Sequence, residues 1–142
     1  MPVPARTEVT VTRTPGGALV AHNARGARLS MSGSDPGSFS PVELLLAAIA
    51  GCSAIDVDTI TSRRAEPQEF TVRVGGTKTR DERGGNLLQD IAVEFTVRFP
   101  EGEAGDAARA ILPTALAQSH DRLCTVSRTV EAGVPVAIHT AG

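Results

Sequence analysis

The two cysteines are the residues of this 142-residue chain with the most distinctive chemistry. Cys52 lies within SPVELLLAAIAGCSAIDVDTI (residues 40–60), the most apolar helix-like stretch, and Cys124 lies within SHDRLCTVSRTV (residues 119–130). A cysteine thiolate can act as a nucleophile or as a metal ligand. A free cysteine is also among the most frequently buried residue types, so position alone leaves a packing role open for both.

Polar residues lie close to both thiols in the sequence. Asp56 is one helical turn beyond Cys52, and a carboxylate beside a buried thiol is costly unless an arginine pairs with it. Such an arginine would also stabilise a thiolate and make Cys52 nucleophilic at neutral pH. Ser119 or Asp121 is predicted to cap a short helix that holds Cys124 in or near its first turn, where the helix dipole favours negative charge.

A metal site is an alternative use of these side chains. His120 and Cys124 have the i, i+4 spacing that places two ligands on one helix face, and Cys52 could supply a third. However, His120 falls where a helix is predicted to begin or end, and three ligands of mixed origin form a weak set. We therefore interpret His120 as a solvated side chain, and we expect neither a metal nor an organic cofactor.

Composition and charge limit the class of protein. The 14 Lys and Arg residues nearly balance the 16 Asp and Glu residues, which argues against a broad basic surface for nucleic acid. The start, MPVPARTEVTVTRT, has no apolar segment of the signal-peptide type, and no apolar run approaches the roughly 18 to 20 residues of a membrane span. We expect a cytoplasmic protein with one domain over residues 1–142 and no nucleic-acid or membrane partner. In a reducing compartment, two cysteines are more typical of reactive or buried thiols than of a structural disulfide.

Hydrophobic periodicity predicts the elements that would position these residues. Period-two patterns predict three antiparallel strands, a later hairpin and a closing strand, over residues 7–14, 18–24, 27–33, 69–80, 87–100 and 134–140. Helices are predicted over residues 101–119, where Pro113 should bend or break the helix, and around Cys124. Antiparallel strands with helices set apart from them indicate an α+β domain.

The central helix carries Cys52 and is unusually apolar. Ser40 is its N-cap candidate, with Pro41 at N1 and Glu43 at N3, so the helix is predicted from Pro41 to about Arg64. From residue 44 to residue 50 every side chain is apolar, and a helix that is apolar all round must be covered on every side. One sheet in a small domain covers one face. We therefore expect an obligate homodimer with this helix near the two-fold axis.

The two cysteine segments, SPVELLLAAIAGCSAIDVDTI and LCTVSRTV, followed by a closing strand, resemble the OsmC/Ohr family, and the wording of the first is closest to its OsmC-like branch. The resemblance covers the element order of nearly the whole chain. It implies an intertwined α+β homodimer that reduces organic hydroperoxides in oxidative-stress defence, with an external dithiol as reductant. Carried over by position, Cys52 would be the peroxidatic cysteine and Cys124 the resolving cysteine.

Glu43 is the third candidate catalytic residue. The hydroperoxide-reducing branch has a Glu directly after the Pro of this motif, whereas this chain has Val42 there and Glu43 next. Glu43 could orient the arginine that activates the thiolate, or it could serve only in a capping box. Candidates for that arginine precede the helix: Arg13, Arg25 and Arg28. The alternative function is a non-catalytic dimeric module that binds a small apolar or thiol-reactive ligand.

Overall fold

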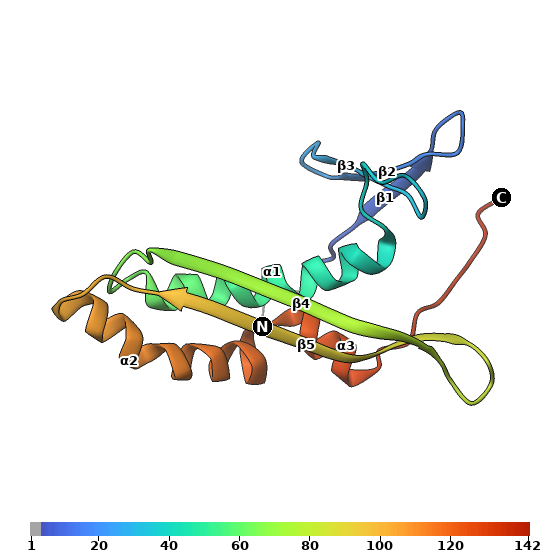
Figure 1. Cartoon of the computed structure of the whole chain (residues 1–142). Coiled ribbons are helices and arrows are strands. Elements are labelled where there is room, and N and C mark those ends of the chain that lie inside the picture. Colours follow the sequence, from blue (N-terminus) through green and yellow to red (C-terminus); the bar gives the residue numbers. More distant parts are fainter. Residues whose placement is uncertain (1–3) are drawn as a thin grey trace. The chain divides into compact units, whose positions relative to one another are not determined.

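The structure, a computed structural model, describes residues 4–142. The chain divides into two compact units, one that extends to Leu45 and one from Leu46 to Gly142. The boundary falls within helix α1 (Pro41–Thr61), so this helix contributes to both units (Figure 1). The assignment of residues 1–142 to a single domain stays a prediction.

The N-terminal unit contains a three-stranded antiparallel sheet, as predicted. Its strands pair in the order β1-β2-β3, with the bounds β1 (Val9–Arg13), β2 (Leu19–Asn23) and β3 (Arg28–Met31). Gly16 and Gly17 have φ angles of 94° and 93° in the turn between β1 and β2. Glycine adopts this conformation without steric cost, so the PGG sequence lets the chain reverse here.

A capping box fixes the start of α1. The Ser40 hydroxyl accepts a hydrogen bond from the Glu43 N–H at 3.1 Å, and the Glu43 carboxylate accepts one from the Ser40 N–H at 2.8 Å. The helix ends at Thr61 rather than near Arg64, because the following residues form a turn in which the Arg64 N–H donates to the Thr61 carbonyl. The predicted start is confirmed, and the predicted end is a few residues too late.

Only part of α1 is covered by its own chain. Its buried residues share one face at helical spacing: Ile49, Ala50, Val57 and Thr61. Ile55, on another face, is 69% exposed. By length and hydropathy alone α1 could cross a membrane, with 22% of its apolar window buried, although the core helix of a soluble protein meets the same two criteria. The sequence shows no long apolar run here because Asp56 and Asp58 interrupt it.

The second unit is built along a long antiparallel hairpin of β4 (Glu69–Arg80) and β5 (Asn86–Arg98), as predicted (Figure 1). From Ile91 onward alternate residues of β5 are partly buried, which confirms the period-two pattern of the sequence there. Phe70 and Phe95 pack edge to face, with ring centroids 6.0 Å apart. Antiparallel sheets together with helices make the fold α+β, in agreement with the prediction.

Helix α2 (Glu103–Gln118) follows the hairpin and passes through Pro113 without ending. The sequence predicted that Pro113 would bend or break the helix, and the break does not occur: Pro113 is exposed, and one backbone hydrogen bond missing on the solvent side does not stop the helix. Near the start of α2, Gly105 approaches the preceding chain. A Cβ at this position would lie 1.6 Å from the Pro100 carbonyl oxygen, so no other residue fits without a backbone shift.

A π-helical turn, η1 (Ser119–Leu123), joins α2 to helix α3 (Thr125–Ala132). The Cys124 N–H donates to the Ser119 carbonyl at 2.8 Å, a bond that spans five residues, as in a π-helix. The predicted short helix near Cys124 is confirmed. Its N-cap is Cys124 itself rather than Ser119 or Asp121, because the π turn continues the helical path through both of those residues.

The closing strand predicted over residues 134–140 does not form in this chain. Gly133 ends α3 in the left-handed conformation, and residues 134–142 have no regular secondary structure. A strand needs a partner edge, and among the residues that the structure describes these residues join neither sheet. Their apolar side chains therefore face solvent, with Val136 86% and Ile138 91% exposed.

Candidate functional site

The second unit brings the two cysteines together. Cys52 lies on α1, Cys124 lies between η1 and α3, and both are free thiols. The two Sγ atoms and a carboxylate oxygen of Asp56 all lie within 4.8 Å of one another. Cys124 is fully buried, whereas Cys52 is partly exposed. A reagent that arrives from solvent therefore meets Cys52 first.

Three hydrogen bonds with two serines hold the Cys124 sulfur in place. As the N-cap of α3, its Sγ accepts from the Ser127 N–H at 3.4 Å. The Ser127 hydroxyl is hydrogen-bonded to the same sulfur at 3.3 Å, and the Ser53 hydroxyl of α1 donates to it at 3.6 Å. Donors at a helix N-terminus stabilise negative charge, so this environment favours a thiolate at Cys124.

The two thiols have opposite acidities. Burial raises the pKa of Cys52, and the neighbouring Cys124 and the charge of Asp56 raise it further, against a smaller opposing effect of the Val126 backbone. Burial alone would also raise the pKa of Cys124, but hydrogen bonds from Ser127, Ser53 and Cys52 outweigh it and lower this pKa below its usual value. Cys124 is therefore the more acidic of the two thiols, and it loses its proton before Cys52 does.

The partner of Asp56 is a serine rather than the arginine that the sequence suggested. The Ser119 hydroxyl donates to the Asp56 carboxylate at 2.9 Å, and Ser119 is 2% exposed. Within residues 46–142, no Lys or Arg forms an ion pair with Asp56. The sequence indicated Ser119 only as a helix cap. Its hydrogen bond to Asp56 depends on the π turn, and no local sequence pattern predicted that turn.

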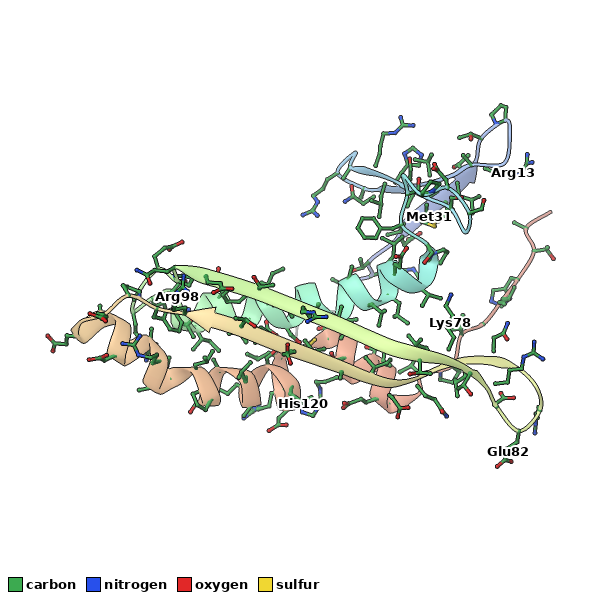
Figure 2. The ribbon with its side chains drawn as sticks, in the orientation of Figure 1. Arg13, Met31, Lys78, Glu82, Arg98 and His120 are labelled. Atoms are coloured by element: carbon green, nitrogen blue, oxygen red, sulfur yellow. The ribbon has the colours of Figure 1, made fainter. Side chains whose placement is uncertain are left out.

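His120 lies outside the cysteine cluster. Its Nδ1 contacts Asp121 and its Nε2 contacts Glu131, each at 3.0 Å, and hydrogen bonds to these two carboxylates raise the pKa of the imidazole. Figure 2 shows His120 at the C-terminal end of α2, and its side chain is 63% exposed. Among residues 4–142, the group of side chains that could hold a metal ion therefore contains Asp56 where the sequence suggested His120.

An apolar groove of about 610 Å³ borders the cluster. Ser53 and Ser127, the hydrogen-bond partners of Cys124, lie in its wall together with Ser119. The apolar part of the wall comes from α1, β5 and α2, through Val57, Val93, Phe95 and Leu116. A small molecule with an apolar body could therefore lie beside the serines that contact Cys124 and Asp56.

The remaining predicted site residues belong to the N-terminal unit. Glu43 closes the capping box of α1, as described above. Of the arginines proposed to activate a thiolate, Arg13 is on β1, Arg28 is on β3, and Arg25 lies in the turn between β2 and β3. Catalytic roles for Glu43 and for any of these arginines stay predictions.

Comparison with known proteins gives consistent matches. A family model described as "OsmC-like protein" matches residues 32–139. An uncharacterized protein of Mycobacterium tuberculosis is 27% identical over 132 residues, covering 92% of this chain and 93% of that protein. Two solved structures share the fold at 16% identity each. An OsmC-like protein of unknown function from Vibrio cholerae has a TM-score of 0.73, covering 90% of this chain and 95% of that one. The organic hydroperoxide resistance protein OhrB of Bacillus subtilis has a TM-score of 0.52, with 88% and 90% covered.

Proposed function

The chain belongs to the OsmC-like protein family, and from this premise we propose that it reduces organic hydroperoxides through the thiol pair of Cys52 and Cys124. The observation that carries the proposal is the approach of two free thiols within 4.8 Å beside an apolar groove. A disulfide has an S–S bond of about 2.0 Å, so the two sulfurs would move closer together to form one. The pair is therefore suited to reversible oxidation.

The first step oxidises Cys52. Its thiol is the more accessible of the two, and the Cys124 thiolate beside it can accept its proton as a general base. The Cys52 sulfur attacks the distal oxygen of the hydroperoxide, the O–O bond breaks, and the alkoxide takes the transferred proton and leaves as an alcohol. Cys52 becomes a sulfenic acid.

The second step joins the two sulfurs. The Cys124 thiolate attacks the Cys52 sulfenic acid, the S–O bond breaks, and the hydroxide takes a proton and leaves as water. Cys124 is buried, so it is less accessible to peroxide from solvent than to the neighbouring Cys52 sulfur. An external dithiol then reduces the disulfide by exchange. The apolar wall of the groove favours an alkyl or lipid hydroperoxide over hydrogen peroxide.

The same proposal includes a cytoplasmic homodimer that acts in oxidative-stress defence. Apolar residues that the single chain leaves exposed support the homodimer, namely Ile55 on α1 and Val136 and Ile138 in the C-terminal segment. A second copy of the chain would cover such surfaces, and a strand from each copy could pair with a sheet edge of the other.

The test is the dithiol-dependent consumption of cumene hydroperoxide by the purified protein. Cys52→Ser should abolish consumption, and Cys124→Ser should leave a sulfenic acid on Cys52 that dimedone traps and mass spectrometry detects. If the unmodified protein consumes no more peroxide than Cys52→Ser does, the peroxidase proposal fails. A non-catalytic module that binds a ligand in the groove then becomes the better explanation.

Substitutions of Glu43 distinguish a catalytic role of this residue from a capping role. Both hydrogen bonds of the capping box are formed, and glutamine can still form them, so a purely capping Glu43 predicts that Glu43→Gln keeps stability and turnover. A catalytic Glu43 predicts a fall in peroxide consumption of roughly tenfold or more with little change in stability. Glu43→Ala, which also removes the cap, controls for the loss of helix stability.

A further inference from the structure

We propose that Cys52, Asp56 and Cys124 together form a binding site for a thiophilic divalent cation, with Zn²⁺ as the best fit. Each side chain offers one donor atom, and the three atoms lie within 4.8 Å of one another. Two thiolates and one carboxylate are a ligand set that suits zinc better than magnesium or calcium, which prefer oxygen alone. The site does not depend on peroxide chemistry, although it uses the same two sulfurs.

The spacing of the donor atoms suits tetrahedral coordination. Zinc lies about 2.3 Å from a thiolate sulfur and about 2.0–2.2 Å from a carboxylate oxygen, so neighbouring donors in a tetrahedron are roughly 3.5–3.8 Å apart. The three donors already lie within 4.8 Å, and they come from two elements, α1 and the junction of η1 with α3. Small side-chain rotations would close the remaining difference.

Asp56 is the residue that peroxide reduction leaves unexplained. Its carboxylate lies within 4.8 Å of both sulfurs, where a negative charge opposes formation of the nucleophilic thiolate. Within residues 46–142 it forms no ion pair with Lys or Arg that would offset this effect. A divalent cation among the three groups would turn their mutual repulsion into attraction and would hold both thiols deprotonated.

Hydrogen-bond partners behind the three ligands are already in place. The Ser119 hydroxyl donates to Asp56 Oδ2 at 2.9 Å, and the carboxylate has a second oxygen that could bind a cation. Ser53 and Ser127 bind the Cys124 sulfur at 3.6 Å and 3.3 Å. Partners of this kind orient metal ligands and commonly change metal affinity by about 10- to 100-fold. The three serines also line the groove, from which a water molecule could supply a fourth ligand.

Metal binding and disulfide formation exclude each other, because each uses both sulfurs. Binding of Zn²⁺ displaces the thiol protons. Oxidation of the zinc-bound pair by a hydroperoxide transfers two electrons from the two thiolates to the O–O bond. The products are the disulfide, free Zn²⁺, an alcohol and, after uptake of two protons, water. The oxidised protein should therefore not bind zinc at this site.

The experiment titrates the reduced full-length protein with Zn²⁺ in competition with a chromophoric chelator, and with Co²⁺ as a spectroscopic probe. No peroxide is present, so the result is independent of the proposed enzymatic activity. We expect one ion per chain and a thiolate-to-cobalt charge-transfer band. Asp56→Asn keeps an acceptor for Ser119 but removes the charged ligand, and it should weaken Zn²⁺ binding at least tenfold. Cys52→Ser and Cys124→Ser should each reduce the charge-transfer band strongly.

Asp58→Asn is the matched control, because Asp58 is an exposed carboxylate on the same helix. It should bind Zn²⁺ within about twofold of the unmodified protein, since surface charges contribute little. The absence of a charge-transfer band with Co²⁺, or equal affinities for Asp56→Asn and Asp58→Asn, would overturn the proposal. Retention of zinc after quantitative oxidation to the disulfide would overturn it as well.

Discussion

Replacement of Ser119 by alanine tests the link between α1 and the π turn. The mutation removes the hydroxyl that donates to the Asp56 carboxylate at 2.9 Å and changes little else, because Ser119 is 2% exposed and alanine suits a helical backbone. A hydrogen bond to a charged group contributes about 1.5–3 kcal/mol to stability. Asp56 is only partly buried, so water can replace part of this bond. We therefore expect a loss near the lower limit, about 1.5 kcal/mol, or roughly tenfold in the folding equilibrium constant.

The assay is urea denaturation followed by circular dichroism, at matched protein concentrations because the stability of an oligomer depends on concentration. Thr114→Ala is the control, since it removes an exposed hydroxyl from α2 and should change the free energy of unfolding by less than about 0.7 kcal/mol. If Ser119→Ala lowers the free energy of unfolding by less than about 0.5 kcal/mol, the hydrogen bond between Ser119 and Asp56 does not contribute to the stability of the packing of α1 on η1.

Three further predictions concern packing, acidity and assembly. Gly105→Ala should destabilise the protein by roughly 3 kcal/mol, because the new Cβ would lie 1.6 Å from the Pro100 carbonyl oxygen; an unchanged urea midpoint would contradict this close approach. Cys124→Ser removes the charge and the hydrogen bond that raise the pKa of Cys52, so the pH midpoint of Cys52 alkylation should move to lower pH, and a shift to higher pH would refute this effect of Cys124 on Cys52. Light scattering at low micromolar concentration should give about twice the 14.7 kDa chain mass, and a stable monomer would rule out the dimer.

Sequence patterns correctly predicted the elements that depend on residues close to one another in the sequence. The period-two pattern of β5 and the Ser40–Glu43 capping box both depend on neighbouring residues, and both are present. The closing strand over residues 134–140 has the same alternation, but a strand also needs an edge to pair with. Pro113 failed as a helix breaker because its cost depends on whether the lost bond faces solvent, which sequence does not reveal.

The site was predictable only in part, because several of its contacts join residues far apart in the sequence. The resemblance to a known family selected Cys52 and Cys124, and the structure places their sulfurs together. The hydrogen bond of Asp56 to Ser119 depends on how α2 continues into η1, and the lowered pKa of Cys124 depends on its place as an N-cap. The sequence shows which side chains could react, whereas the relative acidities of Cys52 and Cys124 depend on tertiary contacts.

The π turn makes the length of this segment more important than most of its side chains. Successive residues of a helix are rotated by about 100°, so deletion of one residue from η1 would turn α3 and its cap away from α1 by about that angle. Ser119 and Cys124 could then no longer both face Asp56 and Ser53. The exposed positions 120–122 should accept many substitutions, but insertions and deletions there should be tolerated poorly, in contrast to the hairpin loop at residues 81–85.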